Sequence, residues 1–364
     1  MFIQNYLVKQ TTTDKCMEHV GYVGTLTNQP FLTAVPALFR ISTTIAPATH
    51  PNGLSKQFNS AESRKLRTIE QSIKEVCKDL NIDDSCHINL RVDDTMADNA
   101  RMVGNLHSLQ GPVLFLGHTY FENFVPPSMG QDLGFEAWLN LLDGIPNDPV
   151  ELGHYLETCT LEERQNLEKM LKKFKSRLSQ EELSYLLAHE IAHAKHHHQL
   201  TNLGAMLMVM TAFKALQMGI KKMGVKGSFA FAFSPLASLC GKAFSRYQET
   251  QADQESTHSE TYLKGMIRYH KRELLNALFK PKGLIEKWTT GSLPSFEKKA
   301  TQLIQSTDWN QNHPNAAKRL QHAVELSTLK EHPNTDMSKV AWVIAGLGFL
   351  KLTKDLYQAI PTPK

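Results

Sequence analysis

The chain has few cysteines and no long apolar run. Its 364 residues include five cysteines, and none of them form a CxxC pair. An odd number of scattered thiols indicates neither a disulfide framework nor a thiolate zinc site, and it favours a reducing compartment. No stretch offers 18 charge-free, strongly apolar residues, so the sequence predicts no transmembrane helix.

An excess of charge of one sign is also missing. The 40 Lys and Arg residues are nearly balanced by 36 Asp and Glu residues, which leaves a net charge of +4 without a basic block. We therefore expect no nucleic-acid partner. The first ten residues lack the basic stretch and long apolar run of a classical signal peptide. We expect a cytoplasmic or peripherally membrane-associated protein, and the sequence does not indicate its oligomeric state.

Histidine, by contrast, is plentiful, with 16 residues. A metal site is therefore to be sought among imidazoles and carboxylates. The sequence predicts a helix from Ser179, which forms a capping box with Glu182, to about residue 199. The consecutive histidines 196–198 at its end are interpreted as a solvated last turn, because neighbouring side chains on a helix point in different directions.

The motif HEIAH lies on this helix. His189 and His193 are four residues apart, so both imidazoles lie on one face and can bind one metal ion. Glu190 is rotated by about 100° from His189, so it flanks the metal and can take a proton from a metal-activated water. Zinc lowers the pKa of such a water to about 7, so one carboxylate suffices as general base.

A hydrolytic zinc ion needs a third protein ligand on another element. The sequence offers Glu249 and Asp253, four residues apart in a second predicted helix. One carboxylate could bind the metal while the other accepts a hydrogen bond from a ligand histidine and fixes its tautomer. Taken alone, this pair is also typical of a solvated helix face.

Three motifs together resemble a known family. HEIAH, then SRYQETQAD at residues 245–253, then HPNAAKR at residues 313–319 resemble the zinc metallopeptidases that include the CAAX prenyl proteases, the HtpX-type proteases and their soluble relatives. A weaker match is Asn99-Ala100, which in family members leads into an active-site edge strand. The resemblance covers about residues 65–328.

The resemblance implies one Zn²⁺ per chain and a protein or peptide substrate. It implies His189, His193 and Glu249 as zinc ligands, Glu190 as general base and Asp253 as support for a ligand histidine. His313 and Arg319 would lie near the site, for oxyanion stabilisation or to hold the Glu249 helix. The alternatives for these two are a His-Pro helix start and a pair with a surface carboxylate.

The predicted fold is a mainly helical α+β, zincin-like metallopeptidase domain over residues 61–330, with a small sheet and the HExxH helix. Residues 1–60 form an N-terminal extension, and 331–364 form an apolar C-terminal helix or tail. An insertion at about 125–176 is interpreted as a lid, a regulatory element or a surface addition.

Smaller elements follow from periodicity and composition. We predict helices over 62–80, around 136–142, over 150–176, over 245–277 and over 295–328 with a break near 312–314, and strands over 87–92 and 111–117. The strand at 111–117 either binds substrate by β-augmentation or is a plain core strand. Residues 202–245 predict two apolar helices, whose lysines favour a soluble hairpin or a peripheral membrane contact over a membrane span.

The sequence thus predicts a zinc-dependent endopeptidase. Two alternatives stay open. One is a membrane-associated protease that acts on lipidated or membrane proteins, which requires residues 203–245 to enter the bilayer. The other is a catalytically latent zinc-binding module with an occluded cleft. The intact Glu190 argues against it, because a purely structural zinc site does not need this carboxylate.

Overall fold

The computed structural model describes about half of the chain. The described residues are 60–83, 86–93, 96, 98–104, 106, 111–126, 130, 132–198, 201–202, 244–280, 295–306 and 314–328. The predicted N-terminal extension, the C-terminal tail and the two apolar helices after residue 202 lie almost entirely outside these ranges. The division into domains therefore stays a prediction.

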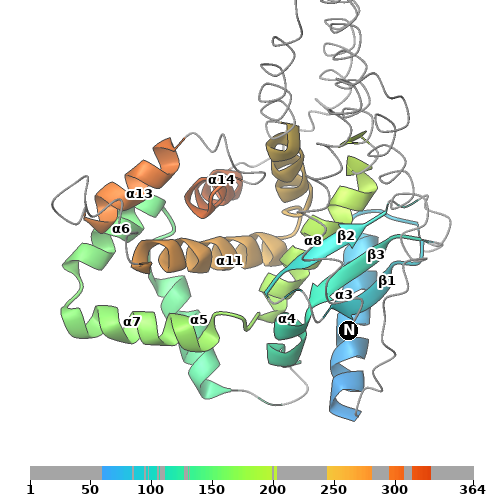
Figure 1. Ribbon diagram of the computed structural model, residues 1–364, viewed down its shortest axis with the longest axis horizontal. Helices are drawn as coiled ribbons and strands as arrows, with labels where there is room; N and C mark the ends of the chain where they lie inside the picture. The colour runs from blue at the N-terminus through green and yellow to red at the C-terminus, as the bar shows by residue number, and fades with distance from the viewer. Residues whose placement is uncertain are drawn as a thin grey trace, which may run out of the picture.

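A three-stranded sheet forms one side of the described structure (Figure 1). Its strands are β1 (Asn89–Asp93), β2 (Ala100–Val103) and β3 (Val113–Gly117). The order is β1-β3-β2, with β1 parallel and β2 antiparallel to β3. Both predicted strands are confirmed. The suggested β-augmentation of the strand at 111–117 is wrong, because β3 is buried throughout and paired on both sides.

A first hydrophobic core lies between the sheet and the helices beside it. It joins α3 (Ser60–Asp79), α4 (His118–Asn123), the sheet, α8 (Gln180–Lys195) and the first half of α11 (Glu260–Phe279). On α3 the buried residues Ile69, Ile73 and Val76 recur at helical spacing. This periodicity confirms the amphipathic helix predicted over 62–80.

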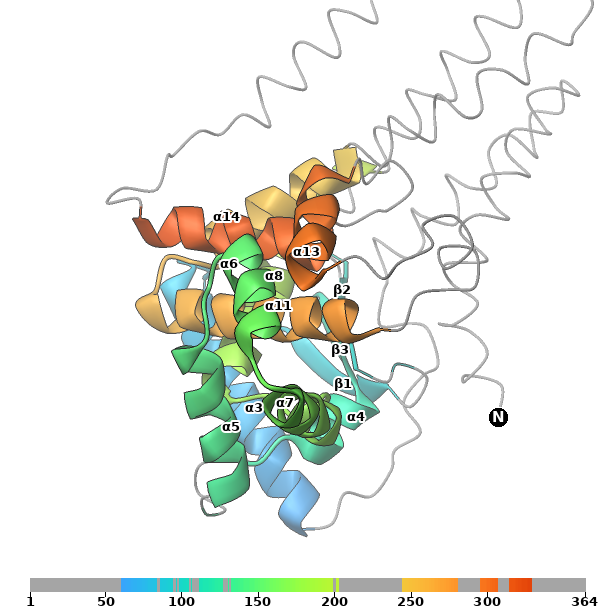
Figure 2. The same ribbon diagram turned by 90° about the vertical axis from the view of Figure 1, so that its left-hand side faces the viewer.

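A second hydrophobic core involves the predicted insertion. It joins α5 (Leu133–Gly144), α6 (Pro149–Thr158), α7 (Leu161–Phe174), α13 (Phe296–Gln305) and α14 (Ala316–Thr328) to the second half of α11. The expected helical stretch over 150–176 is two helices, because Thr160 caps a new helix with Glu163 in a capping box. In Figure 2, α6 crosses in front of α11, and α5 and α7 lie below α11; all three helices contact it.

Helix α11 connects the two cores and crosses α8 at close range. At Gly265 an added Cβ would overlap the carbonyl oxygen of Glu181 on α8. The absence of a side chain at Gly265 therefore permits the two helices to approach closely. Arg268 of α11 also donates two hydrogen bonds to Asp143 at the end of α5, at 2.7 and 2.6 Å. These contacts fix α8, which carries the HEIAH motif, against the rest of the described fold.

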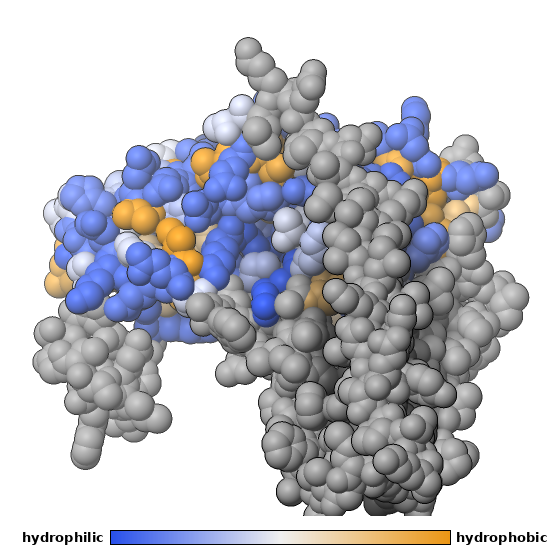
Figure 3. Space-filling model, turned by 90° about the horizontal axis from the view of Figure 1, so that it is seen from above, coloured by the Kyte–Doolittle hydropathy of each residue, from blue (hydrophilic) through white to orange (hydrophobic). Residues whose placement is uncertain are grey.

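The described surface is largely polar. Seen from above, it is mostly hydrophilic, with small separate hydrophobic patches (Figure 3). Within the described ranges, the strongly exposed large apolar side chains are those of Leu133 and Leu161. No helix in the described part of the chain is both long enough and apolar enough to cross a membrane.

Candidate metal centre

The helix that carries the HEIAH motif begins as predicted. Ser179 accepts a hydrogen bond from the Glu182 amide at 3.2 Å, and the Glu182 carboxylate accepts one from the Ser179 amide at 2.8 Å. This capping box satisfies two amides that the first helical turn cannot pair internally. Apolar and small residues on several sides of α8 are buried, which places the helix in the protein interior.

The other end of α8 differs from the prediction. The helix ends at Lys195 rather than near residue 199, because His197 adopts a left-handed conformation with φ of 52°. This conformation reverses the chain direction after the last turn. The side chain of His198 returns to the helix and is only 4% exposed. The interpretation of residues 196–198 as a solvated turn is therefore wrong for His198.

Three donor atoms converge beside α8. The Nε2 atoms of His189 and His193 lie 3.2 Å apart. The Glu249 carboxylate presents one oxygen to each ring, at 3.3 Å from His189 Nε2 and 3.4 Å from His193 Nε2. Glu249 comes from the helix at 244–255. This helix lies beside the end of α8 (Figure 1).

These separations fit a zinc ion. With zinc–ligand bonds of about 2.0–2.1 Å and tetrahedral angles, neighbouring ligand atoms lie about 3.3 Å apart. His189 and Glu249 are each 5% exposed, so these two donors are shielded from bulk water, whereas the His193 side chain is 20% exposed. Two imidazoles and one carboxylate form the donor set of a hydrolytic zinc site, which leaves a fourth position for water or substrate.

Asp253 and Arg319 lie on the side of His189 that faces away from the three donor atoms. Asp253 Oδ1 lies 2.9 Å from His189 Nδ1, the ring nitrogen that faces away from the three donor atoms. Arg319 of α14 donates to both oxygens of Asp253, at 2.5 and 3.0 Å, and its Nη1 atom is 3.8 Å from Glu249. Arg319 thus pairs with a buried carboxylate at the site, not with a surface carboxylate.

The charges in this cluster shift one another's pKa values. Burial lowers the pKa of His189, but the adjacent Asp253 carboxylate outweighs it and raises the pKa to about 10. Burial raises the pKa of Asp253, but the Arg319 and His189 charges outweigh it and hold the pKa far below its usual range. Asp253 is therefore an anion at neutral pH, and it keeps a hydrogen on Nδ1 of His189.

Two further buried side chains complete the support. Tyr185, one helical turn before His189, donates to Asp253 at 2.9 Å and accepts from Arg319 at 3.0 Å. Its oxygen also lies 2.8 Å from Nε2 of His270 on α11. Burial lowers the pKa of His270 well below its ordinary value, so its ring is neutral. Together these contacts hold Asp253 from three sides.

Glu190 points toward the sheet. Its Oε2 atom accepts a hydrogen bond from the Met102 amide of β2 at 2.7 Å. The Met102 amide therefore points away from β3, to the open side of β2, because β2 is at the edge of the three-stranded sheet. The Ala100 amide, two residues earlier, donates a hydrogen bond to Asn99 Oδ1 at 2.9 Å. The edge strand beside the site is therefore β2, which follows the Asn99-Ala100 pair.

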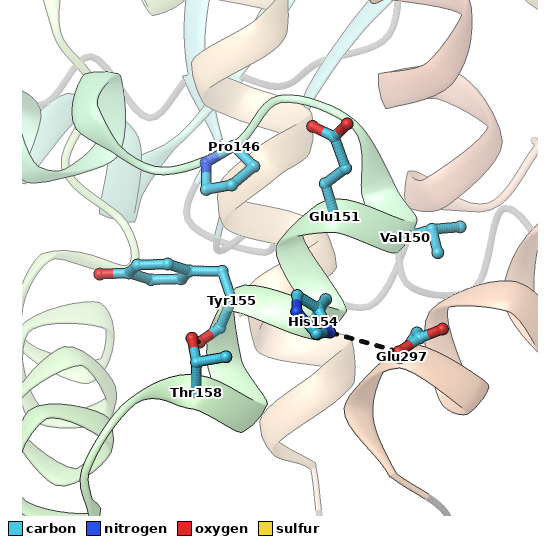
Figure 4. A pocket seen from close by; sticks show the side chains of 7 residues that line it. All are labelled: Pro146, Val150, Glu151, His154, Tyr155, Thr158 and Glu297. Carbon is cyan, nitrogen blue, oxygen red and sulfur yellow. Dashed lines mark hydrogen bonds and ion pairs between the residues drawn. The ribbon is translucent and has the colours of Figure 1, made fainter.

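A second group of possible metal ligands lies between α6 and α13. The group consists of His154 and Glu157 of α6 and Glu297 of α13, and His154 and Glu297 line a pocket of about 440 Å³ (Figure 4). His154 lies 3.5 Å from Glu297, and both side chains are largely exposed. Glu157 accepts the Glu297 amide hydrogen at 2.9 Å. This contact gives Glu157 a structural role at the start of α13.

Residues 165–327 match the model of peptidase family M48. No curated protein and no solved structure matches the chain at a significant level. The M48 match covers less than half of the 364 residues, from within α7 to the end of α14. It includes the segments that carry His189, Glu190, His193, Glu249, Asp253 and Arg319, and it supports a metal-dependent peptidase of the M48 type.

The matched segment carries the seven residues that the sequence singled out. Five of them are in contact at the site: His189, His193, Glu249, Asp253 and Arg319. Glu190 contacts β2, and His313 lies outside the described residues. Sequence reasoning missed Tyr185, His270 and His198. Tyr185 had a signal, because it precedes His189 by four residues on the same helix face. The position of His198 depends on the left-handed His197, which no local pattern indicates for a residue other than glycine.

Proposed function

We propose that this chain is a zinc-dependent endopeptidase. The observation that carries the proposal is the convergence of two imidazole nitrogens and one carboxylate at separations that suit tetrahedral zinc. The M48 match supports the same chemistry independently. A zinc ion held by His189, His193 and Glu249 would act as a Lewis acid toward water and the scissile carbonyl.

Glu190 is suited to move the protons. It follows the ligand His189 directly, and its carboxylate reaches the space between α8 and β2, as the 2.7 Å contact with Met102 shows. We propose that it takes a proton from the attacking water and delivers a proton to the leaving amine. Arg319 carries a permanent positive charge near Glu249. It stabilises negative charge that develops at the site.

The edge strand β2 suits a peptide substrate. An extended peptide that displaces the Glu190 and Asn99 side chains from the Met102 and Ala100 amides can pair with the outer edge of β2 through backbone hydrogen bonds, which tolerate many side-chain sequences. Because Met102 on β2 contacts Glu190 directly, a peptide bound along β2 lies next to the general base. Binding in the middle of an extended chain favours cleavage of internal peptide bonds, which makes an endopeptidase the better fit than an exopeptidase.

Digestion of a peptide library tests this proposal. The wild-type chain, loaded with zinc, should cleave internal bonds, and mass spectrometry of the products locates the cuts. His193→Ala should lose stoichiometric zinc and activity together. Products trimmed one residue at a time from an end would contradict the endopeptidase assignment. A membrane-associated activity remains a prediction that rests on residues 203–245, almost all of which lie outside the described ranges.

A further inference from the structure

The histidines that follow α8 form a buried chain of contacts behind the proposed metal ligand His193. His198 is 4% exposed and lies against the side of His193 that faces away from His189 and Glu249. The Nδ1 atoms of His193 and His198 are 2.6 Å apart. The two ring planes are inclined by 72°. This geometry is that of a directed hydrogen bond rather than of ring stacking.

The hydrogen bond has one possible direction when His193 binds a metal. Two ring nitrogens at 2.6 Å share a single hydrogen, because two N–H groups pointing at each other would repel. A histidine that binds a metal through Nε2 carries its hydrogen on Nδ1. His193 therefore donates, and His198 accepts at Nδ1 and carries its own hydrogen on Nε2.

Gln251 extends this series of hydrogen bonds from His198 to His196. The Nε2–H of His198 donates to Oε1 of Gln251 at 3.2 Å. The amide nitrogen of Gln251 donates to Nδ1 of His196 at 3.3 Å. Nε2 of His196 then lies 3.5 Å from Glu255, which also pairs with Lys195. From His193 to Nδ1 of His196, each contact thus pairs one donor with one acceptor.

Gln251 connects two helices of the proposed metal site through this series of hydrogen bonds. It lies two residues after Glu249 on the helix at 244–255, whereas His196 and His198 follow α8. Its amide therefore ties the end of α8 to the helix that supplies the third donor. On the other side of the site, Asp253 of the same helix holds His189. The two histidines are thus oriented by separate partners, a carboxylate for one and a neutral imidazole for the other.

We propose that His198 is a positioning residue that fixes the ring of His193 for metal binding, with Gln251 holding His198 in the accepting tautomer. The inference rests on the zinc site of the proposed function. Hydrogen-bonding partners of metal-bound histidines typically change metal affinity by 10–100-fold when they are removed. A neutral partner supplies orientation without adding a negative charge to the site.

Two amide substitutions separate this role from simple packing. In His198→Asn, the side-chain oxygen lies where Nδ1 was, so it can still accept from His193. In His198→Gln, the amide reaches the position of Nε2, so it keeps the contact with Gln251 and loses the one with His193. Zinc affinity, measured by competition with a chromophoric chelator, should fall 10–100-fold in His198→Gln and change little in His198→Asn.

The controls keep the outcomes distinct. His87→Ala removes an exposed histidine that belongs to neither group of possible metal ligands, and it should leave zinc affinity unchanged. Equal affinities for the Asn and Gln variants, or wild-type affinity in His198→Gln, would overturn the proposal. If His198→Gln does not fold, Gln251→Leu decides instead, and unchanged zinc affinity there would overturn it. A wild-type chain without stoichiometric zinc would contradict the proposed function itself, whereas zinc-dependent cleavage with an unaffected His198→Gln would contradict this inference alone.

Discussion

Removal of the Arg319 guanidinium should destabilise the described fold, because it leaves the buried Asp253 carboxylate without its cationic partner. Arg319→Met keeps most of the side-chain volume but removes two charge-assisted hydrogen bonds from Asp253, at 2.5 and 3.0 Å. Asp253 is 1% exposed, so water cannot replace them. Breaking a buried ion pair in this way costs about 3–5 kcal/mol.

The remaining partners of Asp253 decide where in the range of about 3–5 kcal/mol the loss of stability falls. In the metal-free protein His189 has a pKa of about 10, so at pH 7 it is protonated and still pairs with Asp253. Tyr185 also continues to donate to this carboxylate. We therefore expect a loss near the lower end, about 3 kcal/mol, in the free energy of unfolding.

Urea unfolding of the metal-free protein at pH 7, followed by circular dichroism, measures this loss. Lys172→Met is the control, because Lys172 pairs with Glu168 on the exposed face of α7 and should cost less than about 1 kcal/mol. Adding Asp253→Asn to Arg319→Met should recover part of the stability, because the buried charge is then removed. A loss as small as that of Lys172→Met, or no recovery in the double variant, would refute the reasoning.

Three further predictions follow from the fold and the site. Gly265→Ala should destabilise the protein by about 1–3 kcal/mol in thermal or urea unfolding, because the new methyl group would overlap the backbone of Glu181. The control is Gly144→Ala, which has open space around the new methyl group and should be neutral or slightly stabilising. Zinc binding at pH 7 should release a proton from His189, seen by calorimetry in buffers of different ionisation enthalpy, and Asp253→Asn should reduce that release. In the metal-free protein His189 contributes stability that is complete below pH 6.5 and lost as the pH rises through about 10, so His189→Gln should flatten the pH dependence in that window.

The sequence predicted those features that depend on local spacing. The capping box at Ser179 and the common face of His189 and His193 follow from helical periodicity, and both are present. Local patterns failed where tertiary structure decides. The predicted helix over 245–277 breaks at residues 256–259. There Ser259 caps the start of α11 by accepting the Thr261 amide.

Long-range contacts at the site could not be predicted from the chain itself. Arg319 on α14 reaches Asp253 on the helix at 244–255 across 66 positions of sequence, and α14 is placed by its packing against α11. The short edge strand β2 has no clear alternation of polar and apolar residues, so periodicity did not indicate it. The family resemblance supplied what spacing could not, namely the pairing of HEIAH with Glu249, Asp253 and Arg319.

The central claim is that a metal held by His189, His193 and Glu249 works together with Glu190 as the base. The most direct test compares the wild-type chain with Glu190→Gln, by metal analysis and by digestion of a peptide library. We predict one zinc ion per chain in both proteins, with peptide-bond cleavage by the wild type and none by Glu190→Gln. Full activity in Glu190→Gln, or a wild-type chain that binds no zinc, would contradict the account.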